Sequence, residues 1–313
     1  MSIPLTATPG TARRLLAYAI EVHPPALYAL IALAWSWSVM GSMVLASPPP
    51  PMLTTADWLP TAGRVSLIFF LMLLYLRALD EIKDLDYDRQ HNPTRPLVRG
   101  SASVADSWGL AALSGAGVLG LALSLSPWVA AWTLLNMAYG VGLLVLERHW
   151  ALFRQNLLLN LALTFPVSAG LNVLAWLALM PSGLAPNGWA AVMVGLMHVA
   201  IFLHMEFGRK LKWPHWCAPD DTSYTLVLGT KRAAAVCFGL LLAALTASTV
   251  LHWNAQGGLW SALPWLAAVP SWLGWRRWQS ARLQHAELKP YFGGAMIAFF
   301  VLNTLVTART LLQ

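Results

Sequence analysis

Long apolar segments dominate the chain, and they restrict its possible folds more than any other feature. Nine segments of roughly 20 residues are apolar enough to cross a bilayer. They occupy residues 25–46, 63–82, 104–124, 127–147, 156–180, 187–207, 232–252, 260–277 and 291–311. Because a bilayer offers no water to exposed backbone groups, apolar segments of this length cross it as helices. The sequence therefore predicts an all-α, polytopic membrane protein.

The charged residues are few and unevenly distributed. Only 11% of the residues are charged, against about 25% in soluble domains. With nine spans, one side receives the N-terminus and the loops near 83–103, 148–155, 208–232 and 276–290. These stretches and Arg77 together contain eighteen of the twenty Lys and Arg residues, and only Arg64 and Arg309 lie on the other side. This positive-inside pattern predicts that the N-terminus and these loops are cytoplasmic.

No stretch of the sequence has the composition of a separate soluble domain. We therefore expect residues 1–313 to form a single transmembrane domain. Its helices could form two four-helix halves, about 25–147 and 156–277, with a ninth helix at 291–311. The net charge of +7 follows from the loop asymmetry, so it indicates contact with membrane lipid and does not require nucleic acid. We expect the protein in a bacterial inner membrane.

The segment LRALDEIKDLDYDRQHNPTRPLVRG (76–100) carries five acids around the end of the second span. On a helix, Glu81, Asp84 and Asp88 share one face, and Asp80 flanks it. Mutual repulsion and the helix dipole both disfavour acids at this position. A hard cation such as Mg²⁺, which prefers carboxylate oxygens, would relieve the repulsion. The alternative is that the acids pair with the neighbouring basic residues Lys83, Arg89, Arg95 and Arg99.

A second charged segment, HMEFGRKLKWPHWCAPDDTSYTLVLGTK (204–231), follows the sixth span. Glu206 falls within the predicted membrane boundary, where an ionisable side chain by default indicates function. Both charged segments follow even-numbered spans, so they project from the same side. We expect them to face each other across a central cavity that opens at the cytoplasmic side. Carboxylates, cations and an apolar chamber together suit a substrate with a diphosphate head and a hydrocarbon tail.

These residues resemble the UbiA superfamily of intramembrane prenyltransferases. The first motif of that family is N-D-x-x-D-x-x-x-D with a downstream Arg-Pro-Leu. In this sequence Asp80 stands at the family's Asn and Glu81 at its first Asp, while Asp84 and Asp88 match; Arg95, Pro96 and Leu97 supply the downstream triplet. The second motif departs from the family, because Lys210 stands where the second acid is expected after Glu206. SYTLVLG (223–229) resembles the segment that follows that motif.

The resemblance implies a Mg²⁺-dependent prenyltransferase that ionises an isoprenoid diphosphate and transfers the prenyl group to an aromatic or other lipophilic acceptor. It implies catalytic roles for Glu81, Asp84, Asp88 and Glu206, which with Asp221 would be the metal ligands. The implied diphosphate-binding residues are Asp80, Lys83, Tyr87, Arg95, Asn156, Asn160, Arg209 and Lys210. For Asn156 and Asn160, hydrogen bonds between helices are an equally good explanation.

Two other functions fit parts of the sequence. The superfamily includes membrane terpene cyclases, in which the double bonds of the prenyl chain capture the carbocation, and the altered second motif and seventeen Trp residues are compatible with that reaction. Trp35 and Trp37 lie deep in the first span, where they could line the chamber. A transporter would use the acids as an ion pathway, but it would need charged residues near the middle of the membrane, where six of the nine spans have essentially none.

Overall fold

The computed structural model describes residues 11–47, 55–217, 223–255 and 258–311, and its elements in these ranges are all helices. The first group of helices is α1 (Thr11–Val22), α2 (Pro25–Leu45), α3 (Thr55–Lys83), α4 (Leu85–His91), α5 (Val104–Leu125), α6 (Pro127–His149), α7 (Ala151–Gln155), α8 (Leu157–Leu179) and η1 (Met180–Ser182). The remainder are α9 (Gly188–Arg209), η2 (Pro214–Trp216), α10 (Tyr224–Leu228), α11 (Thr230–Asn254), η3 (Gly258–Ala267), α12 (Ala268–Ser280) and α13 (Lys289–Leu311). The predicted all-α class is confirmed.

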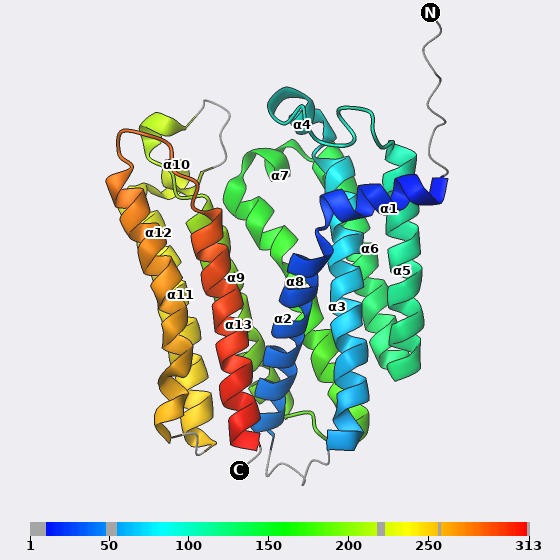
Figure 1. Cartoon of the computed structure of the whole chain (residues 1–313), viewed down its shortest axis with the longest axis vertical. Helices are drawn as coiled ribbons and strands as arrows, with labels where there is room; N and C mark the ends of the chain where they lie inside the picture. The colour runs from blue at the N-terminus through cyan, green and yellow to red at the C-terminus, as the bar shows by residue number, and fades with distance from the viewer. Residues whose placement is uncertain (1–10, 48–54, 218–222, 256–257, 312–313) are drawn as a thin grey trace, which may run out of the picture.

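Seven helices of the described residues are long and apolar enough to cross a membrane. They are α2, α5, α6, α8 continued by η1, α9, α11 and α13. The spans predicted at 63–82 and 260–277 lie in α3 and in η3 with α12, which run alongside the others in Figure 1 but are not among these seven. The protein is thus a multi-pass membrane protein, and the total of nine spans stays a prediction.

The long helices begin where local capping chemistry supplies partners for free backbone N–H groups. Ser103 and Asp106 form a reciprocal capping box at the start of α5. Ser126 caps α6, and Pro127 follows at the first helical position, where its missing N–H costs nothing. Asn187 accepts from the backbone N–H of Ala190 at the start of α9. These short polar side chains define where each apolar segment becomes helical.

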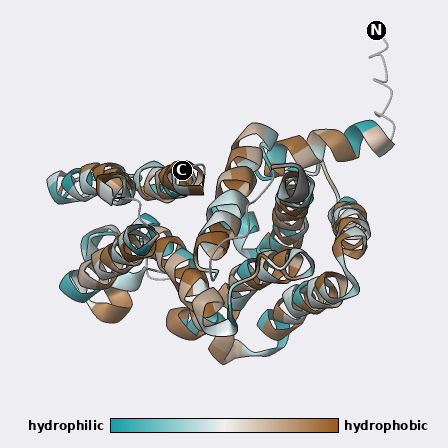
Figure 2. Cartoon of the chain, turned by 90° about the horizontal axis from the view of Figure 1, so that it is seen from below, coloured by the Kyte–Doolittle hydropathy of each residue, from teal (hydrophilic) through white to brown (hydrophobic). Residues whose placement is uncertain are grey.

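The helices form two groups that α2 joins. One group contains α3, α5, α6 and α8, and the other contains α9, α11, α12 and α13; α2 contacts α3, α8, α9 and α13. Figure 2 looks along the bundle and shows these helices side by side, with hydrophobic residues spread over all of them. The short helices α1, α4, α7 and α10 all lie at one end of the bundle (Figure 1). The loops at that end contain most of the charged residues of the two motifs, 76–100 and 204–231.

An aromatic cluster centred on Trp35 lies where the two groups meet. Trp35 of α2 is 1% exposed, and its ring lies 4.8 Å from that of Phe69 in α3, 4.4 Å from Phe202 in α9 and 6.3 Å from Phe300 in α13. Its Nε1 donates to Asn172 Oδ1 in α8 at 3.0 Å. One side chain of α2 therefore contacts four other helices, so its place is in the packed interior.

A buried polar network lies beside this cluster. Asn303 of α13 donates to Ser38 Oγ and Ser42 Oγ of α2, at 2.8 and 2.9 Å, and accepts from Ser248 of α11 at 2.7 Å. Ser38 also contacts His198 Nε2 of α9 at 2.8 Å. Packing and interhelical hydrogen bonds are the main attractions between helices in lipid. This network therefore specifies how α2, α9, α11 and α13 are aligned.

We predict that Gly208→Ala destabilises the contact between α9 and α13. A Cβ at Gly208 would lie 2.1 Å from a ring carbon of Phe292, which is fully buried. Overpacking of this kind costs about 1–3 kcal/mol, which thermal unfolding in detergent would detect as a lower Tm. Gly195→Ala in the same helix is the control, because nothing lies within 4 Å of its Cβ position. Equal Tm values for the two variants would contradict this packing.

Candidate active site

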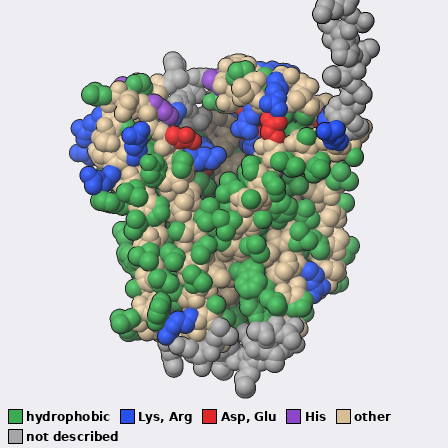
Figure 3. All heavy atoms as spheres, in the orientation of Figure 1, with side chains coloured by type: hydrophobic (Ala, Val, Ile, Leu, Met, Phe, Trp, Pro, Cys, Tyr) green, Lys and Arg blue, Asp and Glu red, His purple; other side chains and the backbone are tan. Residues whose placement is uncertain are grey.

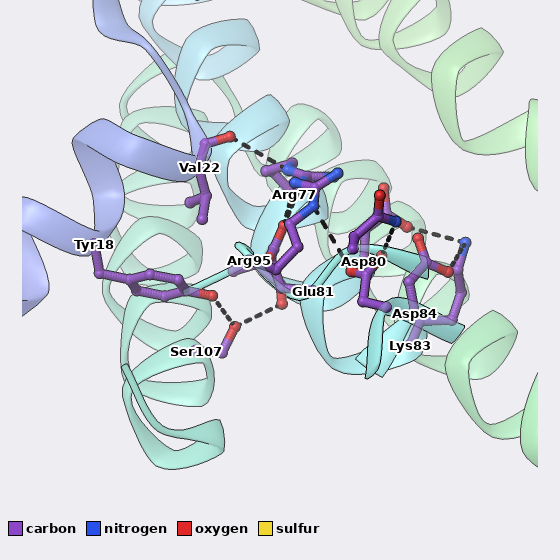
Figure 4. Close-up of polar contacts among 12 residues, drawn as sticks. Tyr18, Val22, Arg77, Asp80, Glu81, Lys83, Asp84, Arg95 and Ser107 are labelled. Atoms are coloured by element: carbon purple, nitrogen blue, oxygen red, sulfur yellow. Dashed lines mark hydrogen bonds and ion pairs between the residues drawn. The ribbon is translucent and has the colours of Figure 1, made fainter. Parts of the chain in front are cut away.

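The end of α3 holds a buried carboxylate between two arginines. Glu81 is 2% exposed and forms ion pairs with Arg77, one helical turn earlier, and with Arg95. Arg95 Nη1 lies 3.0 Å from Glu81 Oε1, and its Nε lies 3.8 Å from Asp88 Oδ2. Figure 4 shows both guanidinium groups directed at Glu81. Because Glu81 Oε2 is buried with no hydrogen-bond partner, this carboxylate retains an unused ligand oxygen.

The turn after α4 brings Arg95 back to α3. The backbone N–H of Arg95 donates to the Asn92 carbonyl at 3.1 Å, and the N–H groups of Ser101 and Ala102 donate to the Pro96 carbonyl. Gly100 has a φ of 77°, a left-handed conformation that favours glycine. Leu97 packs against the main hydrophobic core. The Arg-Pro-Leu triplet therefore forms a structured turn that places a cation over Glu81.

The remaining acids of the first motif are also paired with cations or donors. Lys83 Nζ lies 3.2 Å from Asp80 Oδ1 and 3.6 Å from Asp84 Oδ1, as Figure 4 shows. Asn92 Nδ2 donates to Asp88 Oδ1 at 2.6 Å. The pKa of Asp84 is above its usual value because burial raises it, Lys83 lowers it, and the Asp80 and Asp88 carboxylates raise it again. This cluster thus has excess negative charge that a cation would stabilise.

The helical register continues through this motif, but the side chains separate. The Asp84 and Asp88 N–H groups donate to the carbonyls four residues earlier, both at 2.8 Å. Glu81 and Asp88 nevertheless share Arg95, whereas Asp80 and Asp84 share Lys83. Among the described residues, no three Asp, Glu, His or Cys side chains lie close enough together to hold a metal ion as they stand. Apart from oxygens without a partner, such as Glu81 Oε2, a metal here would compete with these cations for the carboxylates.

The end of α9 carries a second set of charges. Glu206, with a side chain 16% exposed, pairs with Arg209 Nε at 2.6 Å and with Lys210 Nζ at 2.9 Å. The following segment holds this end in place. Ser223 Oγ donates to the Lys210 carbonyl at 3.0 Å, and the fully buried Tyr224 ring stacks on Phe207 at 4.0 Å. The residues that resemble the family's second segment therefore anchor the loop that carries Lys210.

The two sets of charges lie at the same end of the bundle and face one space. The helices α4 and α10, which follow α3 and α9, lie at the same end in Figure 1. Figure 3 shows a hollow at this end between two groups of acidic and basic side chains. Lys289, at the start of α13, lies within electrostatic range of Arg209, Arg77 and Arg95. Cations from both groups of helices therefore converge there, an arrangement that suits a multiply charged anion.

Other predicted site residues have different surroundings or lie outside the described part. Asn156 caps α8 by accepting from the Leu159 N–H at 3.0 Å, and the Asn160 carbonyl accepts from Thr164. Tyr87 is 52% exposed on α4 and stacks on His91. Asp221 and its neighbour Asp220 lie outside the described residues.

The structure adds site residues that the sequence analysis did not assign. Arg77 contacts Glu81, and Asn92 contacts Asp88. Both contacts have the i, i+4 spacing of a helix, so spacing alone could have identified them. No sequence pattern pointed to Lys289 as a site residue, because α13 is far from both motifs in the sequence.

The donor set at the end of α3 is compatible with Mg²⁺. Glu81, Asp84 and Asp88 offer hard carboxylate oxygens, and Mg²⁺ usually takes one or two of these and completes its coordination with water and phosphate. The buried Glu81 Oε2 without a partner is an oxygen that a cation could use at no cost in lost hydrogen bonds.

Comparisons with known proteins agree with this architecture. A solved apo structure of a UbiA homolog from Aeropyrum pernix K1 superposes with a TM-score of 0.57 and 21% identity, over 90% of this chain and 96% of that chain. A structure from work on digeranylgeranylglyceryl phosphate synthase in membranes gives a TM-score of 0.59 and 12% identity, over 94% of this chain and 99% of that chain. No curated protein sequence matches. The model of the UbiA prenyltransferase family matches residues 34–303, and the chain therefore belongs to that family.

Proposed function

We propose that the protein is a Mg²⁺-dependent prenyltransferase that ionises an isoprenoid diphosphate and transfers the prenyl group to an aromatic or other lipophilic acceptor. The observation that carries this proposal is the pair of charged helix ends, α3 and α9, on either side of one hollow. Membership of the UbiA prenyltransferase family supports the same reaction class. From the positive-inside pattern, we place this end of the bundle in the cytoplasm and the protein in a bacterial inner membrane.

The cations of the site would bind and orient the diphosphate. Arg95 uses Nη1 for Glu81 and only a long contact for Asp88, which leaves N–H groups for phosphate oxygens. Lys210 and Arg209 approach from α9, held by Glu206. When the allylic C–O bond breaks, its electron pair moves to the diphosphate oxygen, and these fixed positive charges stabilise the developing negative charge. Lys83 contributes from the other side of the acidic motif.

Mg²⁺ held by Glu81, Asp84, Asp88 and Glu206, with Asp221 as a further candidate, would supply additional positive charge beside the leaving group. In the described structure, ion pairs with Arg77, Arg95, Lys83, Arg209 and Lys210 hold the carboxylates of Glu81, Asp84, Asp88 and Glu206 in place. Asp80 lies beside this set and shares Lys83 with Asp84. Each of these carboxylates would therefore contribute negative charge beside the bound Mg²⁺.

The aromatic cluster supports a second candidate, a terpene cyclase. A carbocation survives only where water is excluded, and aromatic faces tolerate positive charge. Trp35, Phe69, Phe202 and Phe300 form a water-free aromatic cluster between the two groups of helices, in which Trp35, Phe69 and Phe300 are fully packed. A water-free aromatic interior would favour either reaction, and the product would depend on whether an acceptor is bound.

We predict that Asp84→Asn abolishes turnover, because it removes an anionic ligand from the acidic motif. Pyrophosphate release from geranylgeranyl diphosphate should fall by about 10²–10³-fold, and removing Mg²⁺ with EDTA should have the same effect on the unmodified protein. Asp86→Asn is the matched control, since the Asp86 side chain is 92% exposed and its ion pair among the described residues is with Arg89 on the surface. Equal activity of the two variants, both monodisperse in detergent, would refute the assignment.

Lys210→Met tests the altered second motif. Loss of a charge-assisted hydrogen bond costs about 1.5–3 kcal/mol, so the KM for the prenyl diphosphate should rise tenfold or more. Lys231→Met, which removes an exposed cation from the start of α11, should leave the KM unchanged. A KM that rises equally in both variants would indicate a general surface-charge effect and exclude a specific role for Lys210.

Product analysis separates the two candidate reactions. Purified protein in lipid nanodiscs receives geranylgeranyl or farnesyl diphosphate with no acceptor, and the lipid extract is analysed by mass spectrometry. The transferase proposal predicts no cyclic hydrocarbon or terpene alcohol under these conditions. Formation of such products without an acceptor would replace the transferase by the cyclase.

A further inference from the structure

A second hollow lies beside α1, separate from the space between α3 and α9. It has a volume of about 440 Å³ and lies between α1 and the turn that follows α4. Its polar lining comes from Arg13, Arg14, Tyr18, Glu21, Arg99 and Ser101. The lining thus has three cations and one carboxylate. We call this hollow the α1 cleft.

The α1 cleft lies at the end of the bundle that carries the charged loops. Figure 1 shows α1 lying across the end of the bundle, nearly at right angles to α3 and α5. Its Leu16 and Ile20 side chains are 62% and 50% exposed, whereas Tyr18 and Val22 are buried against the bundle. A helix with an exposed apolar face at this position lies in the lipid interface. Trp108, exposed near the start of α5, is typical of the same level.

Ion pairs hold the walls of the α1 cleft. Arg14 Nη2 lies 2.8 Å from Asp106 Oδ1, and Arg99 Nη2 lies 2.6 Å from Glu21 Oε2. Arg13 is exposed and makes no ion pair or hydrogen bond within the described ranges. The lining therefore has positive charge in excess of its acids, and of its three cations Arg13 is the one without an ion pair among the described residues.

The α1 cleft is built on a fixed framework. Tyr18 and Ser107 are hydrogen-bonded at 2.8 Å, and Ser107 donates to the Ala78 carbonyl of α3 at 2.8 Å, as Figure 4 shows for the first contact. Arg99 also donates to the Thr94 carbonyl at 3.2 Å and to Ser101 Oγ at 3.0 Å. A site whose walls are already ordered loses little entropy when a ligand binds.

We propose that the α1 cleft binds the phosphate headgroup of an anionic glycerophospholipid. Arg13 would contact the phosphate, while Leu16 and Ile20 lie beside the acyl chains. Leu16 and Ile20, exposed on the same helix as Arg13 and Arg14, are the reason for choosing a lipid over a soluble anion, which would not contact them. This site is distinct from the diphosphate site, because none of its lining residues belongs to the acidic motifs.

The α1 cleft nevertheless touches the candidate active site at two points. Arg77, which pairs with Glu81, also donates from Nε to the Val22 carbonyl at the end of α1, at 3.2 Å. The Arg99 N–H donates to the Arg95 carbonyl at 2.9 Å. A lipid that orders α1 and this turn would therefore support the two arginines that hold Glu81.

Native mass spectrometry of the purified full-length protein tests the proposal. The protein is incubated with equal amounts of phosphatidylglycerol and phosphatidylcholine, and the lipid retained is measured. We expect preferential retention of phosphatidylglycerol and about fivefold weaker retention in Arg13→Gln, since one basic residue near an anionic headgroup contributes about that factor. The control is Arg148→Gln, which removes an exposed arginine from the last turn of α6. This variant should retain as much phosphatidylglycerol as the unmodified protein.

Three outcomes would overturn the proposal. These are equal retention of the two lipids, an equal loss in both variants, and displacement of phosphatidylglycerol by millimolar inorganic phosphate or glycerol phosphate. The last would identify a site for a soluble anion. Because the measurement does not involve turnover, any of these results leaves the proposed transferase reaction unaffected.

Discussion

The position of Trp35 determines how the two groups of helices meet. Its ring contacts aromatic residues of α3, α9 and α13, and its indole N–H binds Asn172 of α8. Lipid tails are as apolar as leucine, so burial of apolar surface does not hold membrane helices together, whereas close packing and interhelical hydrogen bonds do. Together with the Asn303 network, this contact aligns the helices whose charged ends, those of α3 and α9, face one hollow.

At the polar end of the bundle, acidic and basic side chains lie next to one another. Glu81 lies between Arg77 and Arg95, and Glu206 lies between Arg209 and Lys210. A buried carboxylate without such partners would be protonated or would destabilise the fold. The same groups are those that a magnesium diphosphate would need, with the acids for the metal and the cations for the phosphates. The ion pairs thus account for both stability and the proposed chemistry.

Much of the fold and of the candidate site could be predicted from residue patterns, and the predictions that did not hold have physical causes. The apolar segments predicted the helices, and the spacing of Glu81, Asp84 and Asp88 predicted one helical face, which the backbone hydrogen bonds retain. Their side chains nevertheless separate, because Arg95 from the turn after α4 pairs with Glu81 and Asp88, whereas Lys83 of α3 itself pairs with Asp80 and Asp84. Periodicity describes the backbone of one helix, but it contains no information about a cation such as Arg95 that comes from another segment.

The sequence by itself determined the class of the protein, its helices and the two charged motifs, because hydrophobicity, charge and helical spacing are local properties. Tertiary structure decided which groups meet. Trp35 and Asn172 are hydrogen-bonded although 137 residues separate them, and α1 forms a cleft with a turn some eighty residues later. Such contacts depend on the packing of whole helices in three dimensions, which no local pattern encodes.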